Sequence, residues 1–397
     1  MNWCKYIKKI KEMLQKIFSV KNDLRTNHKV ATVLGIKIKF YYNKDRNYPF
    51  IKRMHVPDKY KYIHVMNNGI HSVNIIKFMN KYFDSNEHCF IFPFVMLSKT
   101  KSQLPPNLKN VFYTPLNNVD IHNINKIIIH GLFDSLLINF LYKNKQFLKK
   151  TYWFIWGGDL YAAKNTKADN YVRKHLTGII TAFDKEVYEK KYGKCKKFYY
   201  ATYPHDMTED MIVKNNKDKN YIHIQVNNSA DETTLEMLDI LSKFKNEPIK
   251  ISTILSYKTV GQKDVQMQIM KKGYETFKDK FNPIIEFMPK EKFANHLASV
   301  DIYISNQNRQ QGNGNASFVC AFGGGHGGKV FTKKGTSVYE EYNKLGIKYF
   351  DTDTIKNLSF DEFIAYDLQT KEKTIALLKE RMKDETKVRQ WDKVFEN

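Results

Sequence analysis

Cysteine is scarce in this sequence, and the cysteines present are not paired. The 397 residues include four of them, separated by long stretches of chain: Cys4, Cys89, Cys195 and Cys320. No Cys-x-x-Cys pair occurs, and this spacing argues against both a zinc site and a disulfide framework. We therefore expect a protein of a reducing compartment, the cytoplasm.

Long apolar runs are also missing. The best candidate, residues 127–142, is interrupted by four polar or charged side chains, namely His130, Asp134, Ser135 and Asn139. It cannot form a membrane-spanning helix, which needs about 20 mostly apolar residues. The N-terminus likewise lacks the apolar stretch of a secretion signal. These absences predict a soluble or peripheral protein.

Acidic residues are outnumbered, 41 against 65 lysines and arginines, which gives a net charge of +24. The first 60 residues hold 15 of the basic residues and only four acidic ones. A segment of this kind is typical of proteins that bind nucleic acid or an anionic membrane, and it also arises as an ordinary lysine-rich surface. The 14% aromatic content favours nucleic acid, but no zinc-finger or RNP motif accompanies it.

Residues 1–59 form a basic extension with two expected elements. Residues 2–20 place apolar side chains at helical spacing between lysines, which predicts a basic amphipathic helix with Trp3 near its start. Such a helix lies on an anionic membrane or packs against the rest of the protein, because both need the same apolar stripe. Residues 29–42 alternate apolar and lysine side chains around Gly35 and predict a hairpin.

Strand-like and helix-like segments alternate from residue 60 onward, which predicts parallel sheets covered by helices. In residues 60–210 these segments are 62–66, 71–83, 88–92, 126–130, 136–142, 152–156 and 178–181. In residues 219–375 they are 221–226, 232–245, 249–255, 265–280, 284–287, 290–298 and 301–305.

A polar, charged stretch around residues 203–219 separates the two series, and residues 376–397 are expected to form a C-terminal helix. The length alone suggests two or three domains. The fold class is therefore α/β, with two Rossmann-like domains facing a central cleft. Ligands of such domains bind near the carboxyl ends of the strands.

The segment 301–315 runs from an apolar strand into a cation, two amides and two glycines, before a helix expected at 316–322. Backbone N–H groups and the helix dipole at such a start favour an anion, so we predict a phosphate contact here. A dinucleotide site is disfavoured because Ser317 stands where the fingerprint needs its third glycine. A simple tight turn remains the alternative.

Two further motifs imitate known ligand sites. Residues 323–329 match the spacing of a P-loop, but Val330 replaces its Ser or Thr and the order of elements is reversed, so we expect a flexible glycine connection. Asp351 and Asp353 form a DxD motif, which holds a metal in some sugar transferases and equally well caps a helix. No metal is predicted.

Two ionisable residues follow expected strands. Asp159 comes after two glycines in residues 154–161, where it either caps the next helix or acts as a general base for a sugar hydroxyl. His130 ends the strand 126–130 and has a side chain suited to proton transfer, although a single histidine is more often structural.

Several of these segments, in this order, resemble bacterial glycosyltransferase family 56 over about residues 62–341. The strongest pieces are Ile155-Trp156-Gly157 with Asp159-Leu160-Tyr161, and Arg309-Gln310-Gln311-Gly312 with Gly314. The weaker pieces are His130-Gly131 with Phe133, and Val226 with Asn228-Ser229 and Asp231. The first 60 residues have no counterpart in the family, Gly158 replaces an alanine, and the loop 323–328 is longer and richer in glycine than expected.

The resemblance implies a GT-B enzyme whose first domain binds the acceptor and whose second binds a nucleotide sugar, usually without a metal. The family's known activity transfers 4-acetamido-4,6-dideoxygalactose from its TDP derivative to a polyprenyl-diphosphate-linked saccharide in enterobacterial common antigen synthesis. We expect a peripheral glycosyltransferase of this kind at the cytoplasmic face of the bacterial inner membrane, held on anionic lipid by its basic extension. No nucleic acid is expected as a partner. The alternatives are a nucleic-acid-binding protein and a noncatalytic GT-B-like sugar-binding protein.

The resemblance and the strand-end motifs together assign expected roles. The catalytic base is Asp159, with His130 as second choice. Donor-binding residues are Asn228, Ser229, Asp231, Phe287, Met288, Arg309, Gln310, Gln311, Gly312 and Gly314. Acceptor-side residues are Asn68, Gly69, His71, Trp156, Gly157, Gly158 and Tyr161. Arg309 and the N–H groups of the two glycines would stabilise the diphosphate leaving group as its charge grows.

Overall fold

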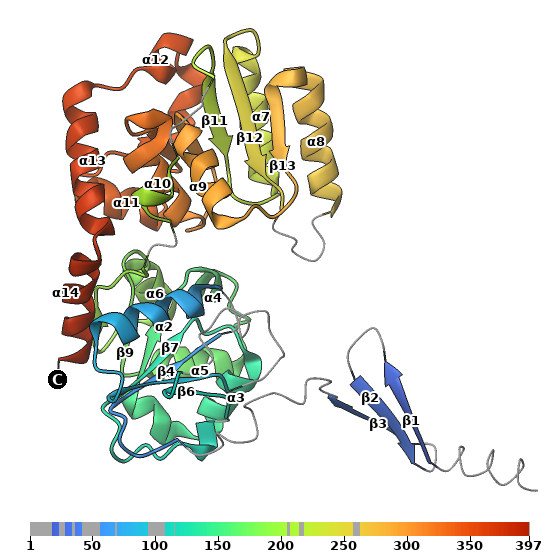
Figure 1. The fold of residues 1–397 in the computed structure, drawn as a ribbon, viewed down its shortest axis with the longest axis vertical. Coiled ribbons are helices and arrows are strands. Elements are labelled where there is room, and N and C mark those ends of the chain that lie inside the picture. The colour runs from blue at the N-terminus through green and yellow to red at the C-terminus, as the bar shows by residue number, and fades with distance from the viewer. Residues whose placement is uncertain are drawn as a thin grey trace, which may run out of the picture. The chain divides into compact units, whose positions relative to one another are not determined.

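The computed structural model describes residues 18–23, 28–33, 36–41, 56–67, 70–93, 108–114, 116–204, 207–213, 218–256 and 263–396. The chain divides into two compact units, residues 1–54 and 55–397 (Figure 1).

The smaller unit contains a three-stranded antiparallel sheet. Its strands are β1 (Phe18–Asp23), β2 (His28–Val33) and β3 (Ile36–Tyr41), in that order. The hairpin predicted for residues 29–42 is confirmed as β2 and β3, which pair from Val33 with Ile36 to His28 with Tyr41. The helix predicted for residues 2–20 is wrong at its end, because residues 18–20 belong to β1; residues 2–17 lie outside the described part of the chain.

The larger unit begins with a seven-stranded parallel sheet in the order β10-β9-β8-β7-β4-β5-β6. The strands are β4 (Tyr62–Val65), β5 (His88–Ile91), β6 (Val111–Phe112), β7 (Lys126–His130), β8 (Thr151–Phe154), β9 (Gly178–Ile180) and β10 (Phe198–Tyr199). Strands β4 to β9 are buried along their whole length, as expected of a parallel sheet with both faces covered.

Helices cover this sheet on opposite faces. They are α2 (Ile70–Tyr82), α3 (Ser135–Lys143), α4 (Gly158–Tyr161), α5 (Lys167–His175) and α6 (Lys185–Tyr192). Alternate strand residues explain the two layers: Ile63 packs in one core with Leu137 of α3, whereas Tyr62 packs in another with Ile75 of α2. Residues 56–204 with these elements are the first half of the unit.

Residues 218–382 form the second half, around a six-stranded parallel sheet in the order β13-β12-β11-β14-β15-β16. The strands are β11 (Ile222–Val226), β12 (Ile249–Ile254), β13 (Phe281–Ile284), β14 (Ile302–Ser305), β15 (Lys329–Thr332) and β16 (Phe350–Asp351). The helices are α7 (Glu232–Leu241), α8 (Lys263–Phe277), α9 (Lys290–Ser299), α10 (Asn313–Phe322), α11 (Ser337–Lys344) and α12 (Phe360–Ile364).

One strand of this half was predicted in the wrong place. The expected strand 284–287 lies three residues later than the observed β13, Phe281–Ile284. The strand contains Pro283, which lacks a backbone N–H and is tolerated because β13 is the edge strand of the sheet. Beyond it, Ile285 and Phe287 are exposed rather than buried in a sheet.

Each sheet has a point where the strand order reverses. In the first sheet β4 lies between β5 and β7, and in the second β11 lies between β12 and β14. Connections leave opposite faces of the sheet at such a point, so a crevice opens at the carboxyl ends of the two strands. The ends of β7 and β14 therefore place His130 and Ser305 at the edges where ligands bind.

The chain ends by returning from the second half to the first (Figure 1). Helix α13 (Leu368–Met382) packs through Leu378 in the core that contains α10, and α14 (Asp384–Phe395) packs in the core of the first sheet. The Trp391 indole N–H donates to the Thr202 carbonyl over 3.1 Å, and the Tyr62 hydroxyl donates to the Phe395 carbonyl over 2.7 Å.

We predict that Trp391→Ala lowers the free energy of unfolding by about 3–5 kcal/mol, because a fully buried indole leaves a cavity when removed. Urea denaturation followed by far-ultraviolet circular dichroism measures this. Lys393→Ala changes an exposed residue of the same helix and should stay within about 0.5 kcal/mol of the parent. Equal stability of the two variants would contradict the importance of this packing.

Candidate functional site

A polar pocket lies at the carboxyl edge of the second sheet, between the starts of α10 and α11. It is lined by Ser305, Gln307, Arg309, Gln311, Asn313, Ala316, Thr332, Thr336 and Val338. Of the predicted donor residues, Arg309 and Gln311 are therefore in the lining. Arg309 is exposed.

Gly312 sets the start of α10. Its φ of 65° is left-handed, and a Cβ at this position would collide with the Asn228 amide. Asn228 in turn accepts from the Asn315 side chain over 2.7 Å and donates to the Gln311 carbonyl over 3.3 Å. Because α10 starts without a side-chain cap, its first N–H groups are available to an anion at the pocket.

Ser229 and Asp231, which were predicted to bind the nucleotide sugar, hold the segment before α10 in place through hydrogen bonds. Gln307 donates to Ser229 over 3.0 Å and to Asp231 over 2.6 Å, and Gln311 donates to Ser229 over 2.7 Å. Gln307 was not predicted, although it lies within the segment 301–315. These bonds use Ser229 and Asp231 to hold the two glutamine side chains.

Several polar atoms near the pocket are buried without a hydrogen-bond partner among the described residues. They are Gln307 Oε1, Gln310 Oε1, Asn313 Nδ2 and Thr332 Oγ1. Unpaired buried polar atoms cost about 1–3 kcal/mol each, so a cluster of them at one pocket indicates a polar ligand or water.

The two residues predicted to border the nucleobase lie elsewhere. Phe287 and Met288 follow β13, which β12 and β11 separate from β14, and neither residue lines the pocket. Phe287 is 82% exposed. The structure therefore does not bring this pair to the polar pocket.

The acceptor-side residues gather around Trp156. Its ring lies 5.3 Å from Tyr203, 5.6 Å from His71 and 6.0 Å from Phe133, all at steep angles. The Trp156 indole N–H is buried and has no partner within the described ranges. Asn68 and Gly69 lie outside the described residues, so the structure does not place them.

Gly157 and Gly158 lie where the first half meets the second. A Cβ on Gly157, whose φ is 83°, would stand 3.4 Å from the Gln310 side chain, and one on Gly158 would stand 3.9 Å from Arg309 Nη1. The paired glycines thus let the loop after β8 approach the Arg309 segment. This contact brings the two strongest motifs of the sequence together.

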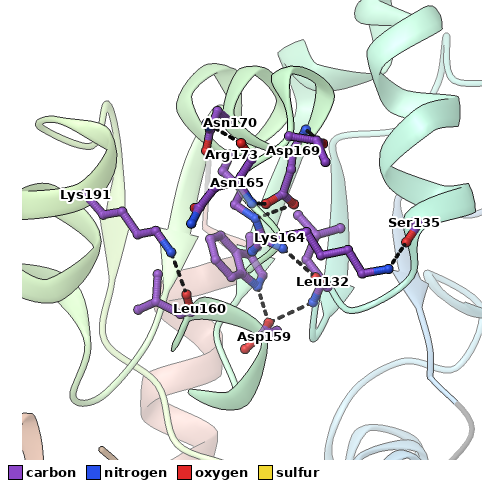
Figure 2. Close-up of polar contacts among 12 residues, drawn as sticks. Leu132, Ser135, Asp159, Leu160, Lys164, Asn165, Asp169, Asn170, Arg173 and Lys191 are labelled. Carbon is purple, nitrogen blue, oxygen red and sulfur yellow. Dashed lines mark hydrogen bonds and ion pairs between the residues drawn. The ribbon is translucent and has the colours of Figure 1, made fainter. Parts of the chain in front are cut away.

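Asp159 is buried, and its carboxylate accepts hydrogen bonds from three N–H groups, of which Figure 2 shows the one from Leu132. Its carboxylate accepts from Leu132 N over 2.7 Å, from the Trp153 indole over 2.5 Å and from Trp156 N over 3.0 Å. Burial raises its pKa, and these hydrogen bonds oppose the rise. The geometry favours a structural role, in which Asp159 ties the loop after β7 to the loop after β8.

His130 points into the core rather than toward the pocket. Its Nε2 lies 2.9 Å from His64 Nδ1, His64 Nε2 lies 3.0 Å from His88 Nδ1, and His130 Nδ1 lies 2.8 Å from the Tyr203 hydroxyl. Complete burial lowers the pKa of His130 to about 3, so it is neutral at pH 7. The Tyr203 side chain contacts both His130 and Trp156 and so connects His130 to the acceptor-side residues.

Asp184 is a carboxylate that the sequence interpretation missed. One oxygen accepts from Tyr161 of the first half over 2.9 Å and from Ser337 of the second half over 2.7 Å. Burial raises its pKa to about 6, and its other oxygen has no partner among the residues described. The signal was present, because Asp184 follows the expected strand 178–181 as Asp159 follows its own.

The DxD motif and the P-loop-like segment have local structural roles. Asp351 accepts from Asp353 N over 3.1 Å and so caps the short helix after β16. Residues 323–325 form a short turn of 3-10 helix before β15, in the order opposite to a P-loop. Within the described residues no group of three or more His, Cys, Asp or Glu side chains is placed to hold a metal, and no helix is long and apolar enough to cross a membrane.

Comparison with known proteins identifies the fold. The structure of Anabaena Alr3699/HepE in complex with UDP and glucose is similar, with a TM-score of 0.60, 11% identity, and coverage of 85% of this chain and 99% of that chain. A trehalose-phosphate synthase from Burkholderia vietnamiensis gives a TM-score of 0.58 at 9% identity, covering 84% and 98%, and apo OtsA gives 0.57 at 10%, also covering 84% and 98%. The GT-B prediction is thus confirmed.

No curated protein matches the sequence significantly. A family does: the model of the 4-alpha-L-fucosyltransferases, glycosyl transferase group 56, matches residues 60–324. That range is more than half of the chain and contains both the Trp156–Tyr161 segment and the Arg309–Gly314 segment. The protein is therefore a glycosyltransferase, and it belongs to the 4-alpha-L-fucosyltransferase family, glycosyl transferase group 56.

Proposed function

We propose that the protein transfers an amino-deoxy sugar from a TDP-linked donor to a polyprenyl-diphosphate-linked glycan in bacterial surface polysaccharide synthesis. The observation that carries the donor assignment is the pocket between the starts of α10 and α11, which combines the Arg309 cation with the first N–H groups of α10. That combination suits a diphosphate, whose charge grows as the sugar leaves. The similar fold of HepE, whose structure is a complex with UDP and glucose, supports a nucleotide-sugar donor.

In this proposal Arg309 and the first turn of α10 hold the diphosphate, and Gln310 and Gln311 orient it or the sugar. The acceptor hydroxyl enters beside Trp156 and Tyr161. Gly158 lies next to Arg309, so the acceptor oxygen and the sugar carbon bonded to phosphate can meet there. The acceptor oxygen forms the new bond to that carbon, and the electron pair of the broken C–O bond goes to the diphosphate.

We assign Asp184 as the general base of the reaction, and Tyr161 as the group that relays the proton of the acceptor hydroxyl to it. Tyr161 donates to Asp184, so its hydroxyl can take the acceptor proton while it passes its own to the carboxylate. The raised pKa of Asp184, about 6, leaves it ionised yet moderately basic near pH 7. Asp159 is the weaker candidate because its oxygens already accept three N–H groups, and His130 lies behind Tyr203.

The site of action in this proposal is the cytoplasmic face of the bacterial inner membrane, where the enzyme is peripheral. The basic residues among the first 60 support attraction to anionic lipid, by roughly 1 kcal/mol for each lysine near the surface. No metal takes part in the steps assigned above. The Arg309 side chain and the α10 N–H groups supply the positive charge.

The donor assignment predicts that TDP raises the melting temperature of the purified protein more than GDP does. A ligand at 100 times its Kd adds about 2.7 kcal/mol of stability. Arg309→Ala should weaken TDP binding by about tenfold or more, because a charged hydrogen bond contributes roughly 1.5–3 kcal/mol. Arg389→Ala, on the exposed face of α14, is the matched control. No stabilisation by any nucleoside diphosphate would refute the donor site.

The helix-start geometry predicts opposite outcomes for two neighbouring glycines. Gly312→Ala forces a left-handed backbone onto alanine and collides with Asn228, so it should abolish TDP binding and cost more than about 1 kcal/mol of stability. Gly314 meets nothing within 4 Å, and Gly314→Ala should stabilise α10 by up to about 1 kcal/mol. Calorimetric titration with TDP and thermal melts test both. Similar effects of the two changes would contradict this geometry.

The base assignment predicts that kcat/KM rises with pH through about 6 and levels off above it, because only ionised Asp184 accepts the proton. Asp184→Asn should lower kcat about 10²–10⁴-fold and remove that inflection. Ser337→Ala removes the hydrogen bond across the halves and should keep the inflection but move it to higher pH, because that bond lowers the pKa of Asp184. Asp159→Asn should chiefly lower the melting temperature; an active Asp184→Asn beside a stable, inactive Asp159→Asn would reverse the two roles.

A further inference from the structure

Phe133 is an aromatic side chain that the fold leaves half uncovered. It lies in the loop between β7 and α3, is 50% exposed, and is in none of the apolar cores that the described residues form. Single exposed apolar side chains are common on protein surfaces, so exposure alone assigns no role. The neighbours of this ring are what distinguish it.

Two glycines leave room for the ring. A Cβ on Gly131, whose φ is 77°, would stand 2.7 Å from Phe133 Cε2, and one on Gly158 would stand 3.3 Å from Phe133 Cε1. The Trp156 ring lies beside them, 6.0 Å from the Phe133 ring between centroids and at 66° to it. With its outer edge against these glycines and half of its surface exposed, the Phe133 ring offers a face to a ligand.

The ring also lies close to the cation of the second half. Phe133 Cε1 and Arg309 Nη1 are both within 4 Å of the position that a Cβ on Gly158 would take. A ligand group above Gly158 can therefore contact both side chains. The Trp156 indole N–H beside them is buried and has no partner within the described ranges. An apolar ring face next to hydrogen-bond donors suits a ligand that carries both C–H and hydroxyl groups, as a pyranose does.

We propose that Phe133 positions the acceptor sugar by stacking its ring on a face of the pyranose that carries only C–H bonds. This rests on the proposed function, which assigns the acceptor to the first half. The donor carbon that reacts lies near Gly158 in that function, because Arg309 holds its diphosphate, so the acceptor sugar has to reach the same glycine. Stacking fixes the tilt of the acceptor ring and with it the direction of the reacting hydroxyl. It also selects the acceptor, because an axial hydroxyl on the stacked face would keep the two rings apart.

The test uses the methyl glycosides of glucose, galactose, mannose and N-acetylglucosamine, with TDP present. Saturation-transfer NMR measures the contact of each sugar proton with the full-length protein. We expect at least one glycoside to bind, with the strongest transfer to the carbon-bound protons of one face and an upfield ring-current shift of those protons. Phe133→Leu should weaken this binding about threefold to tenfold and reduce the shift. Phe133→Tyr keeps the aromatic ring and should preserve both.

Phe198→Leu is the matched control, since it makes the same change at a 37% exposed phenylalanine of β10, and it should leave glycoside binding unchanged. Thermal melts check that each variant is folded. Equal affinity of the parent and Phe133→Leu, equal transfer to both faces of the sugar in the parent, or no binding of any of the four glycosides overturns the proposal. Stabilisation by TDP tests the donor site separately: its loss contradicts the proposed function, whereas intact stabilisation without the stacking contact contradicts the role of Phe133 alone.

Discussion

The buried carboxylate of Asp159 fixes the acceptor edge of the first half. Its three hydrogen bonds join the loop after β7, the strand β8 and the loop after β8, and a buried carboxylate is stable only when it is satisfied in this way. Arg173 stacks over Trp153 at 4.4 Å, is paired with the buried Asp169, and donates to the Leu132 carbonyl. Trp156, Gly157 and Gly158 therefore have defined positions against which the second half can dock.

The two halves are held together by contacts outside the two sheets. Helix α14 follows the second half in the chain but buries Trp391 in the core of the first, so the chain passes between the halves a second time and joins them there. A second contact is polar: Asp184 accepts from Tyr161 and Ser337, one from each half. Asp184 itself lies in the first half, so it keeps Tyr161 and loses Ser337 if the halves part. Because the Ser337 hydrogen bond lowers the pKa of Asp184, its loss raises that pKa, which links the ionisation of the proposed base to closure of the site.

The order of the strands and helices could be predicted from the sequence, because the spacing of apolar residues in each segment reflects which side chains of that segment are buried. It also placed His130 at the end of a strand, and Asn228, Asp159 and Arg309 a few residues after one. It could not show which way a side chain after a strand points, because that depends on hydrogen-bond donors elsewhere in the fold. Leu132 N and the Trp153 indole donate to Asp159 and hold it in the first half. Ser337 donates to Asp184 from the second half. The edge strand β13 was misplaced because Pro283 weakens the strand pattern without preventing pairing.

The polar pocket of the second half and the Trp156 edge of the first half both offer hydrogen-bond donors. The pocket side offers N–H groups at the start of α10 and the Arg309 cation, while the acceptor side offers the buried, unpaired Trp156 indole N–H. Each of these is a donor or a positive charge, so an anionic ligand between the halves satisfies groups on both. The energy of binding such a ligand is then available to hold the two halves together, in the state in which Ser337 of the second half also donates to Asp184 of the first.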